Sequence, residues 1–137
     1  MQIKQILLVD DDEDELDIFK EALGNVSIPL NCLYAQNPET AIQILWEVVP
    51  DYMFVDLNMP RINGLQFMAQ DKVKICFQKT ASILYTTGAN EAVCAKAKQL
   101  GALACIRKTD SIEKLTKVLD TLINKDISEL RSDFKTY

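Results

Sequence analysis

The sequence contains no histidine among its 137 residues, and this absence narrows the chemistry open to the chain. Histidine acid–base catalysis is excluded, a zinc site is disfavoured, and the chain cannot carry a phosphohistidine of its own. Cysteine is also scarce. Cys32, Cys76, Cys94 and Cys105 form no Cys-x-x-Cys pair. We expect them to be small buried residues of a reduced cytoplasmic protein, not a metal site or a disulfide frame.

Long apolar runs and excess positive charge are absent too. No stretch approaches the length of a membrane span, and the N-terminus has too short an apolar run for a signal peptide. The chain has 15 basic and 20 acidic residues, so its net charge of -5 argues against nucleic acid as the main partner. With 48% hydrophobic residues and no linker-like or repetitive segment, the length fits one domain with a real core.

Short apolar segments alternate with segments of helical periodicity along the chain. Such alternation predicts an α/β fold, a doubly wound five-stranded parallel sheet with helices on both faces and right-handed crossovers. Ile127, Leu130 and Phe134 keep a loose helical spacing, so we expect residues 125–137 to be a helical or flexible tail after a 1–124 domain. The five expected strands cover residues 3–9, 30–35, 52–55, 81–86 and 102–106.

The expected helices have start and stop signals. Asp12, Asn37 and Asn90 are expected caps of the first, second and fourth helices. Asp110, with Glu113 three residues later, is the expected cap of the fifth. For the third helix, the apolar spacing of Leu65, Met68 and Ala69 predicts a continuous helix over residues 65–75.

The third strand is followed by the most informative stretch. Its apolar run ends on Asp56, and Pro60 and Gly64 then bracket a loop. Asp56 should therefore lie where a buried strand opens into solvent, the edge at which α/β sheets bind ligands. A single aspartate there is equally compatible with a cap or a turn, so the interpretation depends on the other strand ends.

Those ends carry a consistent set of polar residues: Asp10 and Asp11 after the first strand, Thr86 after the fourth and Lys108 after the fifth. Parallel strands bring their ends to one edge, and neighbouring strands lie about 4.8 Å apart. Converging carboxylates would repel one another by about 4 kcal/mol per pair at an effective dielectric near 20. Oxygen ligands with few protein donors favour Mg²⁺, and a carboxylate beside Mg²⁺ and a lysine suits phosphoryl transfer.

The combined motif is Leu-Leu-Val-Asp10-Asp11, Val55-Asp56-Leu-Asn-Met-Pro60-x-x-x-Gly64, Thr86 and Lys108. It closely resembles the receiver domain of two-component response regulators, of the CheY-like, stand-alone type. The resemblance covers about residues 3–124 and implies a flavodoxin-like fold with strand order 2-1-3-4-5. It also implies a cytoplasmic signalling protein, monomeric or weakly dimeric, that is not an enzyme beyond its own phosphorylation and dephosphorylation.

The resemblance also implies roles for individual residues. Asp56 would be the phosphoacceptor, receiving a phosphoryl group from a partner histidine kinase or histidine phosphotransfer protein. Asp11 and Asp56 would bind Mg²⁺ directly, Asp10 through water, and Asn58 through its backbone carbonyl. Lys108 would pair with the phosphoryl oxygens.

Thr86 would move toward the phosphoryl group and shift a surface that binds a downstream protein. The residues flanking the site depart from the family in part. Thr109 stands where proline is usual, so a trans Lys108–Thr109 bond is the default. Cys105 stands at a frequent aromatic position, and Gly88, next to Thr87, has no side chain to position a water.

Two other functions stay open. A pseudo-receiver would use the same fold only as a binding module, although every phosphorylation residue is present. A haloacid-dehalogenase-like phosphatase would use Asp10 of an Asp10-x-Asp12 motif as nucleophile. It would lack the residue type usual after the second acid, because Glu13 stands there, and a later Gly-Asp motif.

Overall fold

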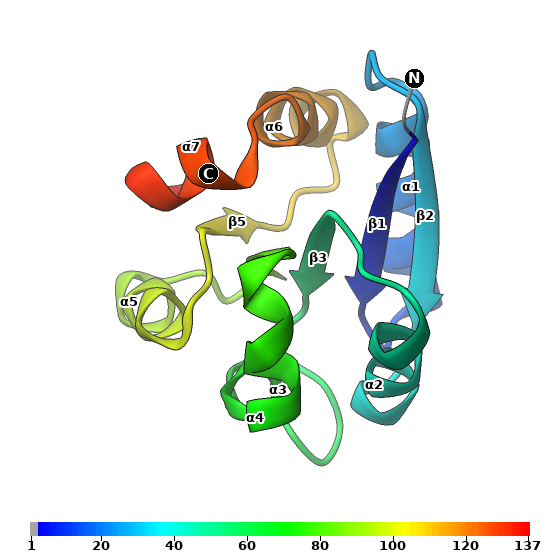
Figure 1. The fold of residues 1–137 in the computed structure, drawn as a ribbon. Helices are drawn as coiled ribbons and strands as arrows, with labels where there is room; N and C mark the ends of the chain where they lie inside the picture. The colour runs from blue at the N-terminus through cyan, green and yellow to red at the C-terminus, as the bar shows by residue number, and fades with distance from the viewer. Residues whose placement is uncertain (1–2) are drawn as a thin grey trace.

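The computed structural model describes residues 3–137, so the first two residues of the predicted 1–124 unit lie outside it. A parallel sheet in the order β2-β1-β3-β4-β5-β6 forms the centre of the molecule (Figure 1). The predicted order 2-1-3-4-5 is confirmed, and one strand extends it. The strands are β1 (Lys4–Val9), β2 (Leu30–Ala35), β3 (Tyr52–Val55), β4 (Ala81–Thr86), β5 (Ala104–Arg107) and β6 (Lys135–Thr136).

Helices cover both faces of this sheet, as the alternating pattern predicts (Figure 1). Phe19 and the leucines of the penultimate helix pack on one face with Phe54 and Tyr85 of the sheet. Phe67 and Met68 pack on the opposite face together with buried side chains of the other helices between residues 38 and 100, whereas Leu130 of the last helix packs on the first face. The helices are α1 (Glu13–Gly24), α2 (Pro38–Glu47), α3 (Gly64–Ala69), α4 (Asp71–Lys74), the 3-10 turn η1 (Ile75–Gln78), α5 (Glu91–Leu100), α6 (Ile112–Ile123) and α7 (Ile127–Ser132).

The prediction of one helix over residues 65–75 is wrong. Gln70 has extended backbone angles, φ -68° and ψ 135°, and separates α3 from α4. Met68 and Val73 lie five positions apart and would diverge by about 140° on a continuous helix. Because the chain breaks between them, both side chains are fully buried.

Most predicted caps are found, and one is displaced. Asp12, Asn37 and Asn90 each accept a backbone N–H of their own helix, with Asp12 accepting from Asp14 at 2.9 Å. The cap of α6, however, is Ser111 and not Asp110, since Ser111 Oγ accepts the Lys114 N–H at 3.2 Å. Both are good cap residues, so sequence preference alone does not separate neighbours.

The C-terminal segment folds back onto the domain. After α6, α7 buries Leu130, and β6 then pairs with β5 in parallel, Ala104 opposite Lys135 and Cys105 opposite Thr136. In Figure 1 the orange-to-red end of the chain turns back from α6 toward β5. The tail is thus a docked helix and a sixth strand, and the five-strand prediction missed that strand.

The cysteine prediction is wrong for two of the four residues. A disulfide joins Cys94 of α5 to Cys105 of β5, and both side chains are buried. Cys32 and Cys76 are free and only half-buried. A separation of 11 residues carries no disulfide signal, because the pairing depends on which face of α5 packs on β5.

The peptide bond after Lys108 has the predicted isomer. No cis peptide bond occurs in residues 3–137, so the Lys108–Thr109 bond is trans, as the sequence predicts. Within the same residues, none of the helices combines the length and the hydropathy needed to cross a bilayer.

Candidate functional site

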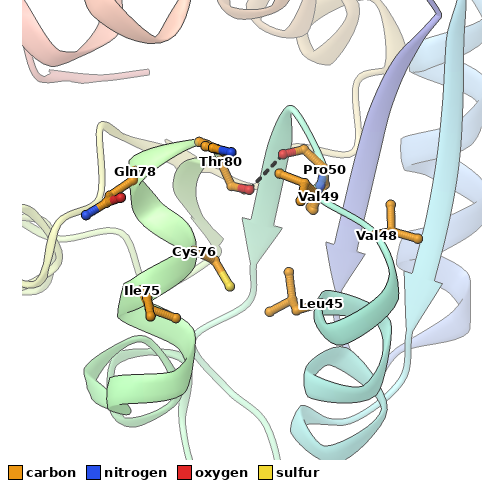
Figure 2. Close-up of a pocket in the computed structure, with 9 residues that line it drawn as sticks. Leu45, Val48, Val49, Pro50, Ile75, Cys76, Gln78 and Thr80 are labelled. Carbon is orange, nitrogen blue, oxygen red and sulfur yellow. Dashed lines mark hydrogen bonds between the residues drawn. The ribbon is translucent and has the colours of Figure 1, made fainter.

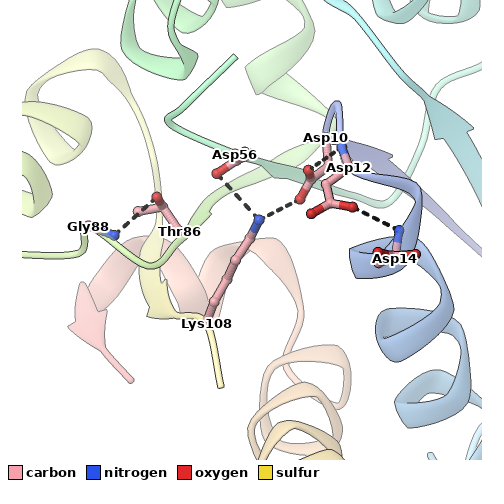
Figure 3. A network of polar contacts seen from close by, with 7 residues as sticks. All are labelled: Asp10, Asp12, Asp14, Asp56, Thr86, Gly88 and Lys108. Carbon is pink, nitrogen blue, oxygen red and sulfur yellow. Dashed lines mark hydrogen bonds and ion pairs between the residues drawn. The ribbon is translucent and has the colours of Figure 1, made fainter. Parts of the chain in front are cut away.

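Strand ends from across the sheet meet at one edge, as predicted (Figure 3). Asp10 directly follows β1, and its N–H donates to Ala35 O at 3.1 Å. Asp56 directly follows β3, and its N–H donates to Val9 O at 2.9 Å. These ladder bonds fix the backbone of both aspartates, so their carboxylates emerge side by side from neighbouring strands.

Three carboxylates form a compact group at this edge. Oxygen atoms of Asp10, Asp11 and Asp56 all lie within 4.8 Å of one another. Asp10 is fully buried and Asp56 is 5% exposed, whereas Asp11 is half-buried. One oxygen of Asp10 also accepts the Asp12 N–H at 3.0 Å. An all-oxygen set this close fits a hard divalent cation better than a soft metal, so the residues present are compatible with Mg²⁺.

Lys108 bridges two of these carboxylates (Figure 3). Its Nζ lies 2.7 Å from Asp10 Oδ2 and 3.5 Å from Asp56 Oδ1, and its side chain is only 7% exposed. Burial lowers the pKa of Lys108, but the hydrogen bond and charge of Asp10, together with the charge of Asp56, raise it above its ordinary value. The lysine is therefore a fixed cation between the ends of β1 and β3.

The Asp56 carboxyl has the most informative titration of the group. Burial, and after it the charge of Asp10, raises its pKa to about 6, although Lys108 and a backbone hydrogen bond from Asn58 act in the opposite direction. A carboxylate held at a raised pKa gains from any cation that binds beside it. Asp56 is thus largely ionised at neutral pH, and a cation bound beside it would stabilise the ionised form.

Thr86 lies at the same edge but has a different partner. Its side chain is fully buried at the end of β4, and its Oγ1 accepts the Gly88 N–H at 3.3 Å. Its carbonyl accepts the Lys108 N–H at 3.0 Å. The structure therefore places Thr86 beside the lysine through the backbone, with its hydroxyl bonded to the following loop (Figure 3).

The loop after Asp56 is shaped by close packing. The Gly64 N–H donates to Leu57 O at 2.8 Å, and a Cβ added to Gly64 would lie 2.2 Å from Asp56 O. Only glycine fits there. Arg61 has φ 71°, a strained value for a non-glycine residue, where Ile62 N–H donates to Pro60 O at 2.9 Å. This loop holds Asn58 exposed beside the acidic group.

The residues expected to flank the site take different positions. Thr87 is exposed and Gly88 is half-buried, and a Cβ added to Gly88 would lie in ordinary contact with Leu57, at 3.8 Å, and with the Thr86 hydroxyl, at 4.0 Å. Cys105 is fully buried and bonded to Cys94, so it lies inside the core of the α5 face.

Three residues near the site were not singled out from the sequence. The Tyr85 ring centroid lies 5.3 Å from Lys108 Nζ, and the buried Tyr85 hydroxyl has no hydrogen-bond partner among residues 3–137. Burial raises the pKa of Glu15. The charge of Lys108 lowers it in part, and the charge of Asp10 raises it further. Arg107 donates from its guanidinium to Ala89 O at 3.2 Å. Tyr85 precedes Thr86 and Arg107 precedes Lys108, so adjacency to a predicted site residue was the available signal.

A separate apolar groove lies at the other end of β3 (Figure 2). Its volume is about 210 Å³, and Leu45, Val49 and Ile75 line it. Thr80 Oγ1 donates to Pro50 O at 2.7 Å on its wall. Because Pro50 precedes β3 and Asp56 follows it, the groove is remote from the carboxylates and contains none of the predicted site residues.

Comparison with known proteins agrees with this geometry. The sequence profile of the response regulator receiver domain matches residues 6–120, which is most of the chain. The chain belongs to the response regulator receiver family. All of the clustered carboxylates, Thr86 and Lys108 lie within the matched receiver domain.

Individual relatives show how far the likeness extends. The receiver domain is 25% identical over 118 residues to a probable chemotaxis protein CheY from Rhizobium etli, covering 86% of this chain and 91% of that protein. It is 24% identical to the regulatory protein AtoC of Escherichia coli, covering 98% of this chain but only 29% of that protein. Because most of AtoC has no counterpart in this chain, the activity of AtoC as a whole cannot be assigned to it.

A solved structure supports the fold. The phosphorylated cyanobacterial phytochrome response regulator RcpA superimposes with a TM-score of 0.78 at 21% identity, covering 93% of this chain and 96% of that chain. Receiver domains of two-component systems interact with histidine kinases or phosphotransfer proteins and with downstream targets. The receiver domain described here thus has the expected fold and an acidic group at the expected edge.

Proposed function

We propose that the chain accepts a phosphoryl group on Asp56 from a phosphohistidine of a partner protein, with Mg²⁺ bound at Asp10, Asp11 and Asp56. The single observation that supports this most is the convergence of three carboxylates and Lys108 at one sheet edge. The absence of histidine is consistent with it, because the phosphohistidine must then belong to another molecule.

The proposed transfer is a displacement at phosphorus. An Asp56 oxygen attacks, a phosphorus–oxygen bond forms, and the bond between phosphorus and the donor's histidine nitrogen breaks. The products are an acyl phosphate on Asp56 and a neutral donor histidine. Mg²⁺ would neutralise charge on the transferring group, with Asp11 and Asp56 as its direct ligands, Asp10 acting through water and the Asn58 carbonyl completing the protein set.

Lys108 would supply the second cation of the reaction. Its Nζ already lies 3.5 Å from Asp56 Oδ1, so a small movement away from Asp10 would bring it to the phosphoryl oxygens. Thr86 would exchange its bond to the Gly88 N–H for a bond that its hydroxyl donates to the same oxygens. Both movements start from residues that the backbone of β4 and β5 holds together.

The output of this reaction would be a change in protein binding. We infer a signalling protein that is not an enzyme beyond its own phosphorylation and dephosphorylation, located in the cytoplasm. A shift of Thr86 and Lys108 would alter the surface of α5, β5 and α6 and bias it between two arrangements.

The test is labelling by a small phosphodonor such as acetyl phosphate, followed by intact mass spectrometry. We expect one phosphoryl group on the wild type with Mg²⁺, none with EDTA and none on Asp56→Asn. Asp110→Asn is the matched control, because Asp110 is exposed and outside the acidic group. Full labelling of Asp56→Asn, or none of the wild type, would reject the proposal.

Asp56→Asn, together with a further variant, Asp10→Asn, and beryllofluoride binding, separates the two other functions considered from the sequence. A phosphatase that uses Asp10 would keep its turnover in Asp56→Asn and lose it in Asp10→Asn. Asp10 is fully buried and bonded to Lys108, which leaves it poorly placed to attack a substrate. A pseudo-receiver would bind neither the phosphoryl group nor beryllofluoride with Mg²⁺.

A further inference from the structure

The C-terminal strand β6 lies against the strand that carries Lys108. Tyr137 N–H donates to Cys105 O at 2.8 Å, and Arg107 N–H donates to Tyr137 O at 2.9 Å. These two bonds continue the β5–β6 ladder to the residue immediately before Lys108. The last residues of the tail therefore contact β5 where it enters the functional site.

The tail has several contacts around α7 and few at β6. Tyr52 Oη donates to Ile123 O at 3.0 Å and to Lys125 O at 2.6 Å, and Leu130 is 3% exposed. Arg131 donates to Phe77 O at 2.8 Å. By contrast, β6 has only two residues, and both are exposed. The strand can therefore leave β5 while α7 stays in place.

Arg107 connects the strand to the loop after β4. Its backbone N–H bonds to Tyr137, its guanidinium donates to Ala89 O at 3.2 Å, and its register partner on β4 is Thr86. The same residue thus contacts the tail and the 86–89 loop, whose Gly88 N–H bonds to the Thr86 hydroxyl. A rearrangement of that loop or of Lys108 must change the surroundings of Arg107.

The observed pairing belongs to one arrangement of the site. Lys108 is closer to Asp10 than to Asp56, at 2.7 Å against 3.5 Å, while Tyr137 is paired with β5. A phosphoryl group on Asp56 would compete for the lysine ammonium, because it adds negative charge and strong acceptor oxygens. Lys108 directly follows Arg107, the last residue of β5, so any backbone shift that accompanies this movement would act on the Arg107 N–H that donates to Tyr137 O.

We propose that residues 135–137 form a strap on the edge of β5 that favours the unphosphorylated arrangement and is released when Asp56 is phosphorylated. The proposal rests on the phosphorylation of Asp56 proposed above. Release would uncover the β5 edge and the adjoining hollow of about 710 Å³, which is lined by Ile106, Leu115 and Tyr137 among others. By reciprocity, loss of the strap must strengthen binding of the phosphoryl group.

The first test measures amide hydrogen exchange by NMR on the full chain, with and without beryllofluoride and Mg²⁺ as the phosphoryl mimic. We expect exchange at the Arg107 and Tyr137 amides to accelerate at least about fivefold when the mimic binds. Amides of β1 provide an internal control, because β1 lies on the far side of β3 and β4 from the strap. Unchanged or slower exchange at both amides would overturn the proposal.

The second test uses two proline variants of the full chain. Tyr137→Pro removes the N–H that donates to Cys105 O, whereas Thr136→Pro removes an N–H that neither of these two bonds uses. We expect Tyr137→Pro to tighten beryllofluoride binding by about fivefold and Thr136→Pro to change it less than twofold. Equal affinity in wild type and Tyr137→Pro would also overturn the proposal.

A final comparison separates the strap from the phosphorylation it depends on. If beryllofluoride fails to bind the wild type, or binds Asp56→Asn equally well, the proposed function has failed and the strap with it. If beryllofluoride binds through Asp56 but neither the exchange rates nor the Tyr137→Pro affinity change, the strap alone has failed.

Discussion

Lys108 forms a buried ion pair with Asp10 across the ends of β3 and β4, with its Nζ 2.7 Å from Asp10 Oδ2. The lysine follows β5 and the aspartate follows β1, with the ends of β3 and β4 between them. Both side chains are almost fully buried, so each compensates the other's charge. This single pair links β5, the edge strand of the predicted sheet, to β1, the strand next to its opposite edge.

We predict that Lys108→Met destabilises the protein by about 3 kcal/mol in EDTA, because it leaves Asp10 buried without its cation. Urea unfolding at pH 7 measures the change. Lys117→Met is the matched control, since Lys117 pairs with Glu113 at 3.6 Å on the surface and should cost less than about 1 kcal/mol. An equal decrease in the free energy of unfolding in both variants would show that the buried pair stabilises the protein no more than the surface pair does.

We predict that Asp56→Asn is more stable than the wild type in EDTA, and that the difference grows with pH. The folded-state pKa of Asp56 is about 6, above the ordinary 3.8, so the folded protein holds this proton more tightly than the unfolded chain. The wild type therefore loses stability relative to the variant as the pH rises from about 4 to 6, by up to about 3 kcal/mol.

Urea unfolding of Asp56→Asn and wild type across pH 3.5–7.5 gives that difference directly. Added Mg²⁺ should reduce it at pH 7 by stabilising the ionised wild-type site. A difference that is independent of pH would contradict the raised pKa of Asp56.

We predict that Gly64→Ala destabilises the protein by about 2 kcal/mol or more and abolishes labelling of Asp56. The new Cβ would lie 2.2 Å from Asp56 O, so the backbone of the site residue must move. Gly24→Ala, at the end of α1, is the control, because nothing lies within 4 Å of its Cβ position. That variant should be neutral or slightly stabilised. Normal labelling of Gly64→Ala would show that the loop tolerates displacement.

We predict that reduction of the Cys94–Cys105 disulfide lowers stability by about 3 kcal/mol, the entropy of a closed loop with a separation of 11 residues. Thermal unfolding with and without a reducing agent measures this loss. The double variant Cys94→Ala, Cys105→Ala should no longer respond to reductant. Cys32→Ser should respond as the wild type does, because Cys32 is free.

The alternation of strands and helices and the gathering of Asp10, Asp11, Asp56 and Lys108 could be predicted because both depend on local signals, whereas the sheet order came from the family resemblance. Apolar runs mark strands, and a polar residue at the end of each parallel strand must reach the same edge. The roles assigned to these residues came from a family resemblance, and they stay predictions until Asp56 is labelled.

Other features could not be predicted, because they depend on contacts between distant parts of the chain. Nothing in Lys135 or Thr136 indicates a strand, since both are exposed and β6 exists only where β5 offers a partner. The extended backbone of Gln70 ends α3 and lets both Met68 and Val73 be buried. The hydroxyl of Thr86 bonds to Gly88, and no pattern of spacing gives the rotamer of a side chain.

The position of β6 also has a consequence for colloidal behaviour. A sheet exposes unpaired backbone groups along its outermost strands, and these groups can template aggregation with other chains. In this sheet β6 occupies one margin and β2 the other, so β5 is shielded while β6 is paired. A variant that loses β6 exposes the backbone groups of β5, and we expect it to aggregate more than the wild type at high protein concentration.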